Sequence, residues 1–284
     1  MLQSIDRRRE HRDEISPSMR EAHKKAESLL ADPGYSISER EFVGVYGESA
    51  VNADTDKTSQ LALHFQQGQS QRVKNAKIIA EVLEAIILEQ AELSEWLGGA
   101  HTLKAARYDD FINKTDMVAE WYSPEDGSRI LALAVDVTFG VTTVADKLEM
   151  IKNEIDSGAL GSIRYFKDAR GDFMGTRNNV PRVVIGVRQE TVEELAALWV
   201  RGDKKALGSH PIQRLLVAEI VEQLQYMHAY AKRRGNQRVA DAYAPSLNIM
   251  RALEAKKRAI PLGTLKDDTV ADAIRWQARR FFGE

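Results

Sequence analysis

The sequence predicts an α/β protein in which a mixed central sheet is flanked by helices, with helical additions at both ends of the chain. Three observations predict this class. Apolar residues recur at three- and four-residue spacing over 75–97, which is typical of a buried helix. The apolar, β-branched runs at 129–139 and 182–187 are typical of strands covered on both faces. Everything after His210 has the periodicity of helices, so we expect the sheet in the middle of the chain.

The chain divides by pattern into three regions. Residues 1–74 are expected to form a helical and irregular N-terminal extension, with a charged helix that ends at Asp32-Pro33-Gly34 and a polar loop at 52–60. Residues 75–205 hold the predicted α/β core, and residues 206–284 hold a C-terminal helical region. The C-terminal helices are expected at 211–233, 246–258 and 268–281, separated at prolines.

Within the core, the expected order is helix, three strands, helix, two strands and helix. The strands are expected at 105–112, 116–122, 129–139, 161–166 and 182–187, and the later helices at 144–155 and 191–200. Ser-Pro-Glu-Asp-Gly at 123–127 is typical of a hairpin loop, which would pair the second and third strands antiparallel. The helix after the third strand is a crossover, which favours parallel pairing. A mixed sheet satisfies both.

Composition excludes several classes of protein. The 284 residues are 43% hydrophobic and 29% charged, which is enough to bury a sizeable core. A net charge of −2 leaves only local patches to attract nucleic acid. The absence of cysteine excludes disulfides, thiolate zinc sites, iron–sulfur clusters and a cysteine nucleophile. The N-terminus has no apolar signal-peptide core, and no apolar run reaches the roughly 18–20 residues of a membrane span, so we expect a cytoplasmic protein with no membrane partner.

Two carboxylates in apolar surroundings are the candidates for chemistry. Asp116 begins the second strand, and Asp136 lies inside LALAVDVTF, where a charge is costly to bury without a cation, a donor or a metal. Acids on paired strands could project toward the same edge and bind Mg²⁺ or Mn²⁺, which prefer oxygen ligands. Such a metal lowers the pKa of a bound water and stabilises charge on a phosphoryl oxygen. Lys147, one turn into the next helix, would offset phosphate charge.

Each of these residues also has a purely structural interpretation. Asp116 follows Asn113-Lys114-Thr115 and could cap a turn. Asp136 could pair with an arginine or with Thr138, and Lys147 could be a solvated helix lysine. Three further acids either face water or extend the acidic site: Asp109, Asp110 and Glu120.

The element order and the acids together resemble the PD-(D/E)xK nuclease superfamily over about residues 76–187. That pattern is helix, three strands, helix and strand, with one acid on the second strand and an acid–x–lysine motif on the third. Asp116 matches the first acid, and Asp136-Val137-Thr138 matches the motif, with Thr138 in the place of the lysine. Some members carry the lysine on the following helix, where Lys147 lies. The resemblance implies a restriction-endonuclease-like core.

The resemblance also implies a glutamate ligand from the first helix, which carries Glu81, Glu84, Glu89 and Glu92. Glu89 is favoured because it lies nearest the apolar stripe. The function that follows is a Mg- or Mn-dependent phosphodiesterase that hydrolyses DNA or RNA. Asp116, Asp136 and Glu89 would hold the metal, and Lys147 and Thr138 would complete the catalytic set.

Two other functions stay open. Thr138 in place of the motif lysine favours a catalytically inactive nuclease-fold module that binds nucleic acid or protein without turnover. The long amphipathic helices at 211–233 and 246–258 instead suit an interaction protein that forms a homodimer. Basic groups on the C-terminal helices could follow a nucleic-acid backbone or complement helix dipoles: 232–234, Arg238, 256–258 and 279–280.

Overall fold

Helices make up most of this protein. The computed structural model describes residues 15–123, 127–136 and 141–283 and is 65% helical. The helices before the sheet are α2 (Pro17–Leu30), η1 (Glu39–Phe42), α3 (Val43–Tyr46), α4 (Glu48–Gln66) and α5 (Gln71–Leu93). Those within and directly after the strands are α6 (Arg107–Asn113), α7 (Val141–Ser157), α8 (Gln189–Val200) and α9 (Lys204–Gly208). The last are α10 (Ile212–Arg233), α11 (Gln237–Lys257), η2 (Gly263–Asp267) and α12 (Thr269–Phe282).

The strands form two small sheets. Their bounds are β1 (His101–Lys104), β2 (Met117–Ser123), β3 (Gly127–Asp136), β4 (Gly161–Lys167), β5 (Met174–Val180) and β6 (Arg182–Gly186). The four-stranded sheet has the order β1-β2-β3-β6, and β4 and β5 pair only with each other. The β1–β2 and β2–β3 pairs are antiparallel, with Met117 opposite Leu133, and the β3–β6 pair is parallel, with Asp136 opposite Gly186.

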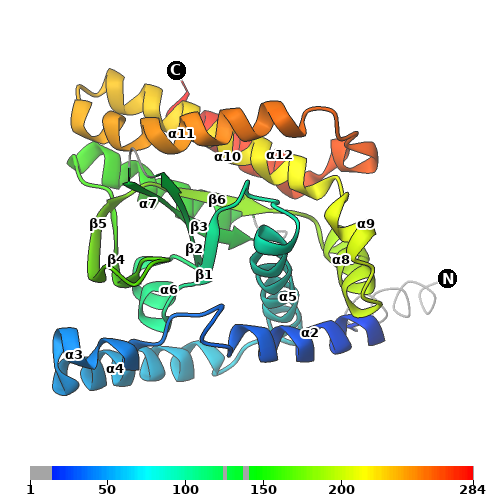
Figure 1. Ribbon diagram of the computed structural model, residues 1–284, viewed down its shortest axis with the longest axis horizontal. Helices are drawn as coiled ribbons and strands as arrows, with labels where there is room; N and C mark the ends of the chain where they lie inside the picture. Colours follow the sequence, from blue (N-terminus) through cyan, green and yellow to red (C-terminus); the bar gives the residue numbers. More distant parts are fainter. Residues whose placement is uncertain (1–14, 124–126, 137–140, 284) are drawn as a thin grey trace.

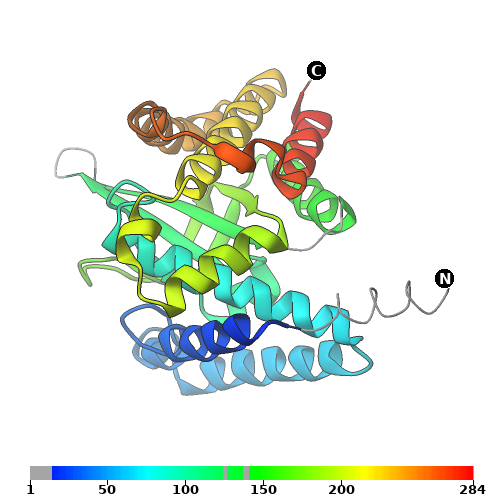
Figure 2. The same ribbon diagram turned by 90° about the vertical axis from the view of Figure 1, so that its right-hand side faces the viewer.

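The helices enclose the four-stranded sheet between two layers. In both views α10, α11 and α12 lie on one side of the molecule, and α2 and α4 lie on the opposite side (Figures 1 and 2). Helix α5 runs between these layers, and Val82, Leu83, Ile86 and Ile87 on it are fully buried. Ser70 caps α5 by accepting a hydrogen bond from the amide of Val73. The largest core cluster joins this helix to β2, β3, β6 and the C-terminal helices.

The predicted restriction-endonuclease-like core is wrong. Helices dominate the described residues, and the six strands found there are short and split between two small sheets, so this part of the chain has no large central mixed sheet. The expected strand at 161–166 exists as β4 but pairs with β5, which the sequence pattern did not predict. The β2–β3 hairpin is confirmed. A strand does pair parallel with β3, but it is β6 and not the strand that directly follows α7.

Three local predictions were also wrong. Residues 105–112, expected as a strand, form the bend before α6 and most of that helix, while the first strand lies earlier, in β1. The expected polar loop at 52–60 lies inside α4, because Val51, Thr58 and Ala62 recur at helical spacing and are buried. Pro245, expected as a boundary, lies within α11.

The C-terminal helices bury their apolar faces inside the protein. Leu216, Ile220, Leu224 and Met227 of α10 are at most 1% exposed, because α11, α12 and β6 pack against that helix. Their amphipathic pattern is thus accounted for without a second copy of the chain, and homodimer formation through them stays a prediction. None of the helices in the described ranges is long and apolar enough to cross a bilayer.

Candidate functional site

The two acids expected from the sequence lie on paired strands. Asp116 immediately precedes β2, and its carbonyl accepts a hydrogen bond of 3.0 Å from the amide of Ala105. Asp136 is the last residue of β3, the antiparallel neighbour of β2. The side chain of Asp136 and the whole of Thr138 lie outside the part of the chain that the structure describes. Lys147 lies in α7 and is half-buried, so it is not a fully solvated helix lysine.

Glu89 contacts residues of α8 and α2. Its Oε2 accepts a hydrogen bond from the indole of Trp199 on α8, and its Oε1 lies 3.7 Å from the ammonium of Lys25 on α2. Five residues along a helix correspond to a turn of about 140° in projection, so Glu84 and Glu89 point to different neighbours. Glu84, rather than Glu89, is the glutamate of α5 that lies close enough to Asp116 to feel its charge.

Four side chains form the candidate site: Glu84, Lys104, Asp110 and Asp116, here called the acid–lysine cluster. They come from α5, the end of β1, α6 and the residue before β2. The ammonium of Lys104 lies 3.1 Å from Oε2 of Glu84, and the carboxyl groups of Asp110 and Asp116 share a hydrogen bond. Two carboxyl groups can share a hydrogen bond only when one of them carries a proton.

Local structure explains how these side chains are held. The backbone of Lys104 is fixed on both sides, because its amide donates to the carbonyl of Tyr35 at 2.7 Å and its carbonyl accepts from Ile37 at 3.0 Å. Helix α6 begins where Oε1 of Glu39 accepts from the amide of Tyr108 at 2.9 Å. It ends at Lys114, whose φ of 53° is the left-handed conformation typical of a helix terminus.

Electrostatics in the cluster favour protonated carboxyls. Burial raises the pKa of Glu84 to about 7, helped by the charge of Asp116 and opposed by Lys104. Burial likewise raises the pKa of Asp110 to about 8, helped by Asp116 and then Glu84. Burial alone would lower the pKa of Lys104, but the nearby carboxylates, Glu84 first, more than offset this and raise it. The cluster therefore has one lysine and three acids. Near neutral pH, protons on Glu84 and Asp110 neutralise the carboxyls that Lys104 does not balance.

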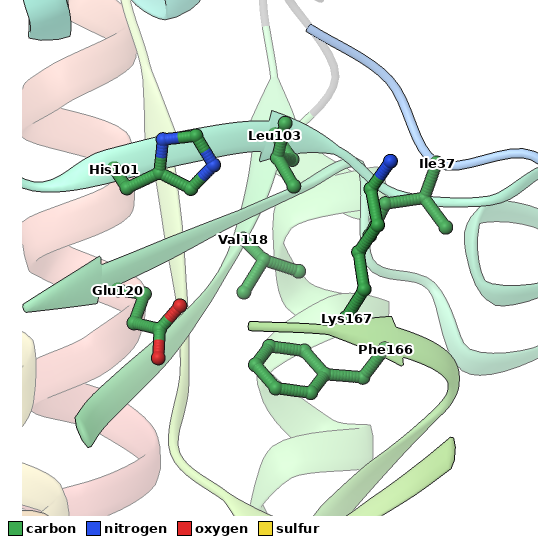
Figure 3. Close-up of a pocket in the computed structure, with 7 residues that line it drawn as sticks. All are labelled: Ile37, His101, Leu103, Val118, Glu120, Phe166 and Lys167. Atoms are coloured by element: carbon green, nitrogen blue, oxygen red, sulfur yellow. The ribbon is translucent and has the colours of Figure 1, made fainter. Parts of the chain in front are cut away.

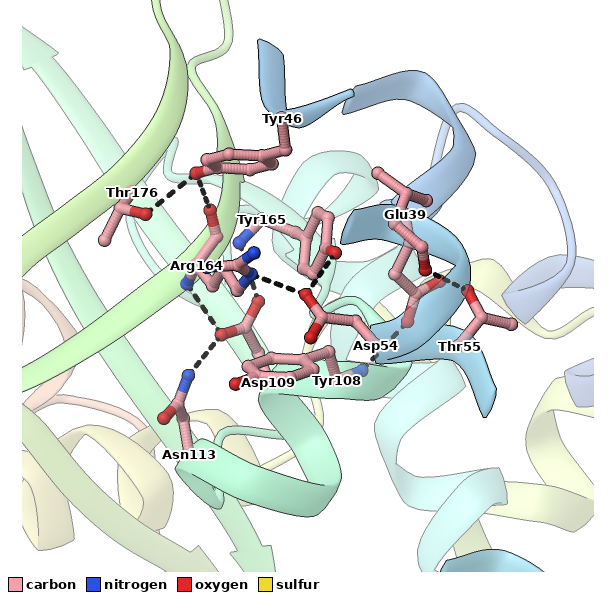
Figure 4. Close-up of polar contacts among 11 residues, drawn as sticks. Glu39, Tyr46, Asp54, Thr55, Tyr108, Asp109, Asn113, Arg164, Tyr165 and Thr176 are labelled. Atoms are coloured by element: carbon pink, nitrogen blue, oxygen red, sulfur yellow. Dashed lines mark hydrogen bonds and ion pairs between the residues drawn. The ribbon is translucent and has the colours of Figure 1, made fainter. Parts of the chain in front are cut away.

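Asp109, the residue before Asp110, has a different environment (Figure 4). It is fully buried, and its carboxylate accepts hydrogen bonds from the amides of Arg164 and Tyr165 at 2.7 and 2.9 Å and from the amide side chain of Asn113. Close by, Oδ2 of Asp54 accepts from the Arg164 guanidinium and the Tyr165 hydroxyl at 2.6 and 2.7 Å. These bonds join α4, α6 and β4, so both carboxylates have a structural role. Neither Asp109 nor Asp110 simply faces water, which was one of the two expectations.

Apart from the acid–lysine cluster, a small hollow lies beside β1, β2 and the end of β4 (Figure 3). Its lining residues are Ile37, His101, Leu103, Val118, Glu120, Phe166 and Lys167. Its volume of about 10 Å³ corresponds to a single water molecule. Glu120 is buried there and accepts a hydrogen bond of 2.8 Å from the amide of Ala169, while Lys167 pairs with Glu41 at 2.7 Å. The hollow is too small for a substrate, and Glu120 is a structural acid.

The donor chemistry of the acid–lysine cluster suits a hard divalent cation, because three of its four groups are carboxyls. A dication would supply the positive charge that protons now supply at Glu84 and Asp110. Among the residues with described side chains, no three His, Cys, Asp or Glu groups lie close enough together to hold a metal as they stand. Binding would therefore need either a shift of these carboxyls or a further ligand.

Sequence reasoning missed Lys104 as a member of the cluster. It preferred Glu89 to Glu84 as the first-helix ligand, and it gave Asp110 as an acid that either faces water or extends the acidic site. It placed Asp110 on a strand, and the alternation of side chains along a strand does not show which of them contacts α5. A usable signal was the spacing of Asp109 and Asn113, which are four residues apart and form a hydrogen bond on one face of a helix.

No protein-family model matches this chain, and no curated protein or solved structure matches it either.

Proposed function

We propose that this protein is a metal-dependent phosphodiesterase that hydrolyses DNA or RNA, with the acid–lysine cluster as its catalytic centre. The single observation that carries the proposal is the excess of carboxyls over cations in that cluster, where Glu84 is buried and Asp110 and Asp116 are half-buried. Burying acids beside one another is costly, and proteins with no use for such a group satisfy it as Asp109 is satisfied. Perturbed carboxyls of this kind are typical of functional sites.

The roles follow from the side chains. Glu84, Asp110 and Asp116 would hold Mg²⁺ or Mn²⁺, and Asp136, at the end of the neighbouring strand, stays a predicted further ligand. When bound, the cation supplies a water of lowered pKa and stabilises charge on a phosphoryl oxygen. Lys104, kept charged by Glu84, would balance negative charge on the phosphate. Lys147 stays the predicted second cationic helper.

Protons in the cluster have a defined place in this scheme. Asp110, with a pKa of about 8, keeps its proton near neutral pH, and Glu84, with a pKa of about 7, is partly protonated there. Both protons would leave as the carboxyls take up a cation, because ligands must be deprotonated. Cation binding is therefore expected to release protons and to strengthen as the pH rises from 6 to 8.

The test is cleavage of labelled single-stranded and duplex DNA and RNA with Mg²⁺ or Mn²⁺, and with EDTA as the metal-free condition. The wild type should cleave at least one substrate, and Glu84→Gln, Asp116→Asn and Asp136→Asn should not. Glu89→Gln is the matched control, because it alters a glutamate on the same helix outside the cluster. No cleavage of any substrate by the wild type would overturn the proposal; nucleic-acid binding without cleavage would instead favour the inactive binding module.

A further inference from the structure

Aromatic rings and cations lie together at one surface where α4 meets α6; Phe65 is exposed and Phe111 is half-buried. The rings of Phe65 and Phe111 lie 6.2 Å apart. The guanidinium of Arg107 lies 5.6 Å from the Phe111 ring, and the ammonium of Lys114 lies 6.0 Å from the Phe65 ring. His64 adds a third ring, 6.1 Å from Phe65. These five residues are here called the cationic–aromatic patch.

The patch is exposed although burial of its rings would be favourable. Phe65 is 49% exposed, Leu63 beside it is 61% exposed, and both Arg107 and Lys114 are exposed. The Lys114 ammonium donates only to the carbonyl of Phe111 among its described hydrogen bonds, so its charge is not cancelled by an acid there. Exposed rings with cations over them at a surface indicate a binding site for an anionic partner with flat groups.

The patch adjoins the proposed catalytic centre. Helix α6 carries both, because Asp110 faces the acid–lysine cluster while Arg107 and Phe111 face the end of α4. Lys114 follows that helix and stands two residues before Asp116. A chain bound along the patch would therefore continue directly toward the cluster.

We infer that the cationic–aromatic patch binds single-stranded nucleic acid and delivers it to the acid–lysine cluster. The inference rests on the proposed function, since it names the substrate class of that same centre. Single strands expose base faces that stack on aromatic rings, whereas a duplex hides them, and the cations on the same surface complement the phosphates. An acidic apolar peptide would also be attracted by the cations, but it would bind an aliphatic side chain as well as the aromatic ring of Phe65.

The basic groups of the C-terminal helices are weaker candidates because internal partners hold several of them. The Arg234 guanidinium lies 2.9 Å from Asp156, Arg233 donates to the carbonyl of Phe282 at 2.6 Å, and Lys257 donates to Gln213 at 2.6 Å. A comparable exposed pair lies on α12, where Trp276 is 58% exposed and Arg280 lies 5.6 Å from its ring. In Figure 1, α12 lies on the side of the molecule opposite α4. Trp276 therefore provides a matched control.

The experiment measures binding of a fluorescein-labelled oligothymidylate of about 16 nucleotides, and of a duplex of the same length, by anisotropy in EDTA. The wild type should bind the single strand more tightly than the duplex. Phe65→Ala should weaken single-strand binding about tenfold. Phe65→Trp should retain the affinity, and Phe65→Leu should lose it, because leucine keeps apolar area but no ring. Arg107→Gln should reduce the slope of log affinity against log salt by about one.

Thermal melts establish that each variant is folded before its affinity is compared. Unchanged affinity in Phe65→Ala, full affinity in Phe65→Leu, or a loss in Trp276→Ala equal to that in Phe65→Ala would each overturn the inference. Because binding is measured without metal, the two proposals fail separately. If the wild type cleaves nucleic acid but Phe65→Ala binds it as tightly as the wild type, only the inference about the patch is contradicted. Phe65-dependent binding without any metal-dependent cleavage would support the patch and contradict the phosphodiesterase.

Discussion

Asp109 and Asp110 are neighbours on α6, but their carboxyl groups meet opposite environments. Asp109 is surrounded by donors, with two backbone amides and the Asn113 side chain bound to it. Asp110 has acids as its leading neighbours, since the charges of Asp116 and Glu84 raise its pKa more than the charge of Lys104 lowers it. The first arrangement holds α6 against β4. The second leaves charge unbalanced, which is what a site for a cation requires and what a purely structural site avoids.

The difference teaches that burial alone does not distinguish a structural acid from a functional one. Burial raises the pKa of both carboxyls. At Asp109 the next three influences are hydrogen bonds that lower the pKa, and only then does the charge of Glu39 raise it, whereas at Asp110 the next two are negative charges that raise it. The neighbours of a buried acid, rather than its depth, therefore indicate whether it is available for chemistry.

The largest expected effect is on activity at Asp110. Asp110→Asn removes a carboxyl that can lose its proton and take up a cation, while keeping the shape of the side chain. We expect metal-dependent cleavage to fall about a hundredfold or more, since the interactions of a metal with its ligands contribute several kcal/mol to the transition state. Single-turnover cleavage rates with Mn²⁺ measure the loss. A variant as active as the wild type would place the chemistry elsewhere.

The next effect is on stability at Asp109. Asp109→Ala leaves the buried amides of Arg164 and Tyr165 and the side chain of Asn113 without an acceptor. We expect the free energy of unfolding to fall by about 3 kcal/mol, because each buried donor left unpaired costs roughly 1–3 kcal/mol. Urea denaturation measures the change. Asp110→Asn is the companion variant, which should lose no stability, and equal losses in both would erase the contrast between the two acids.

A smaller effect is the pH dependence of stability. The folded-state pKa values of Glu84 and Asp110, about 7 and about 8, lie above their unfolded values, so the folded state binds more protons between pH 4 and 8. Stability should therefore fall as the pH rises from 5 to 8.5, since the folded state loses these extra protons over that range. The double variant Glu84→Gln/Asp110→Asn should flatten this part of the profile. Thermal or urea unfolding across that pH range gives the answer, and an unchanged slope in the double variant would contradict the cluster electrostatics.

The smallest effect is expected at Glu89. Glu89→Gln keeps an oxygen for the Trp199 indole but loses the charge that faces Lys25, so unfolding free energy should change by about 1 kcal/mol or less. Its melting temperature should respond to Mn²⁺ as that of the wild type does. If this variant abolishes the Mn²⁺ response, the first-helix ligand is Glu89, as first predicted from the sequence, and not Glu84.

Local pattern predicted part of this structure and missed the rest for identifiable reasons. The β2–β3 hairpin follows from two apolar runs around a turn sequence, which are local features. Helix α6 was missed because it is only seven residues long and depends on distant groups, Glu39 at its start and the amides of β4 around Asp109. Such short helices are set by tertiary contacts that no window of sequence contains.

The sequence predicted that the candidate site would contain carboxylates, but not which residues would form it. Asp116 was found because it begins an apolar strand. Glu89 was preferred to Glu84 because it lies near the apolar stripe, but α5 is buried around most of its circumference, so nearness to one stripe does not show which neighbour a glutamate meets. Lys104 and Glu84 are brought together only by the packing of β1 on α5.

The most direct test of the central claim is a crystal structure of the protein soaked in Mn²⁺ at about pH 8, with the metal located by anomalous scattering. The account predicts a manganese peak bound by carboxylate oxygens of Glu84, Asp110 and Asp116, with the hydrogen bond between the two aspartates broken. A soaked crystal that shows no manganese peak at this cluster, and in which Asp110 is still hydrogen-bonded to Asp116, would contradict it.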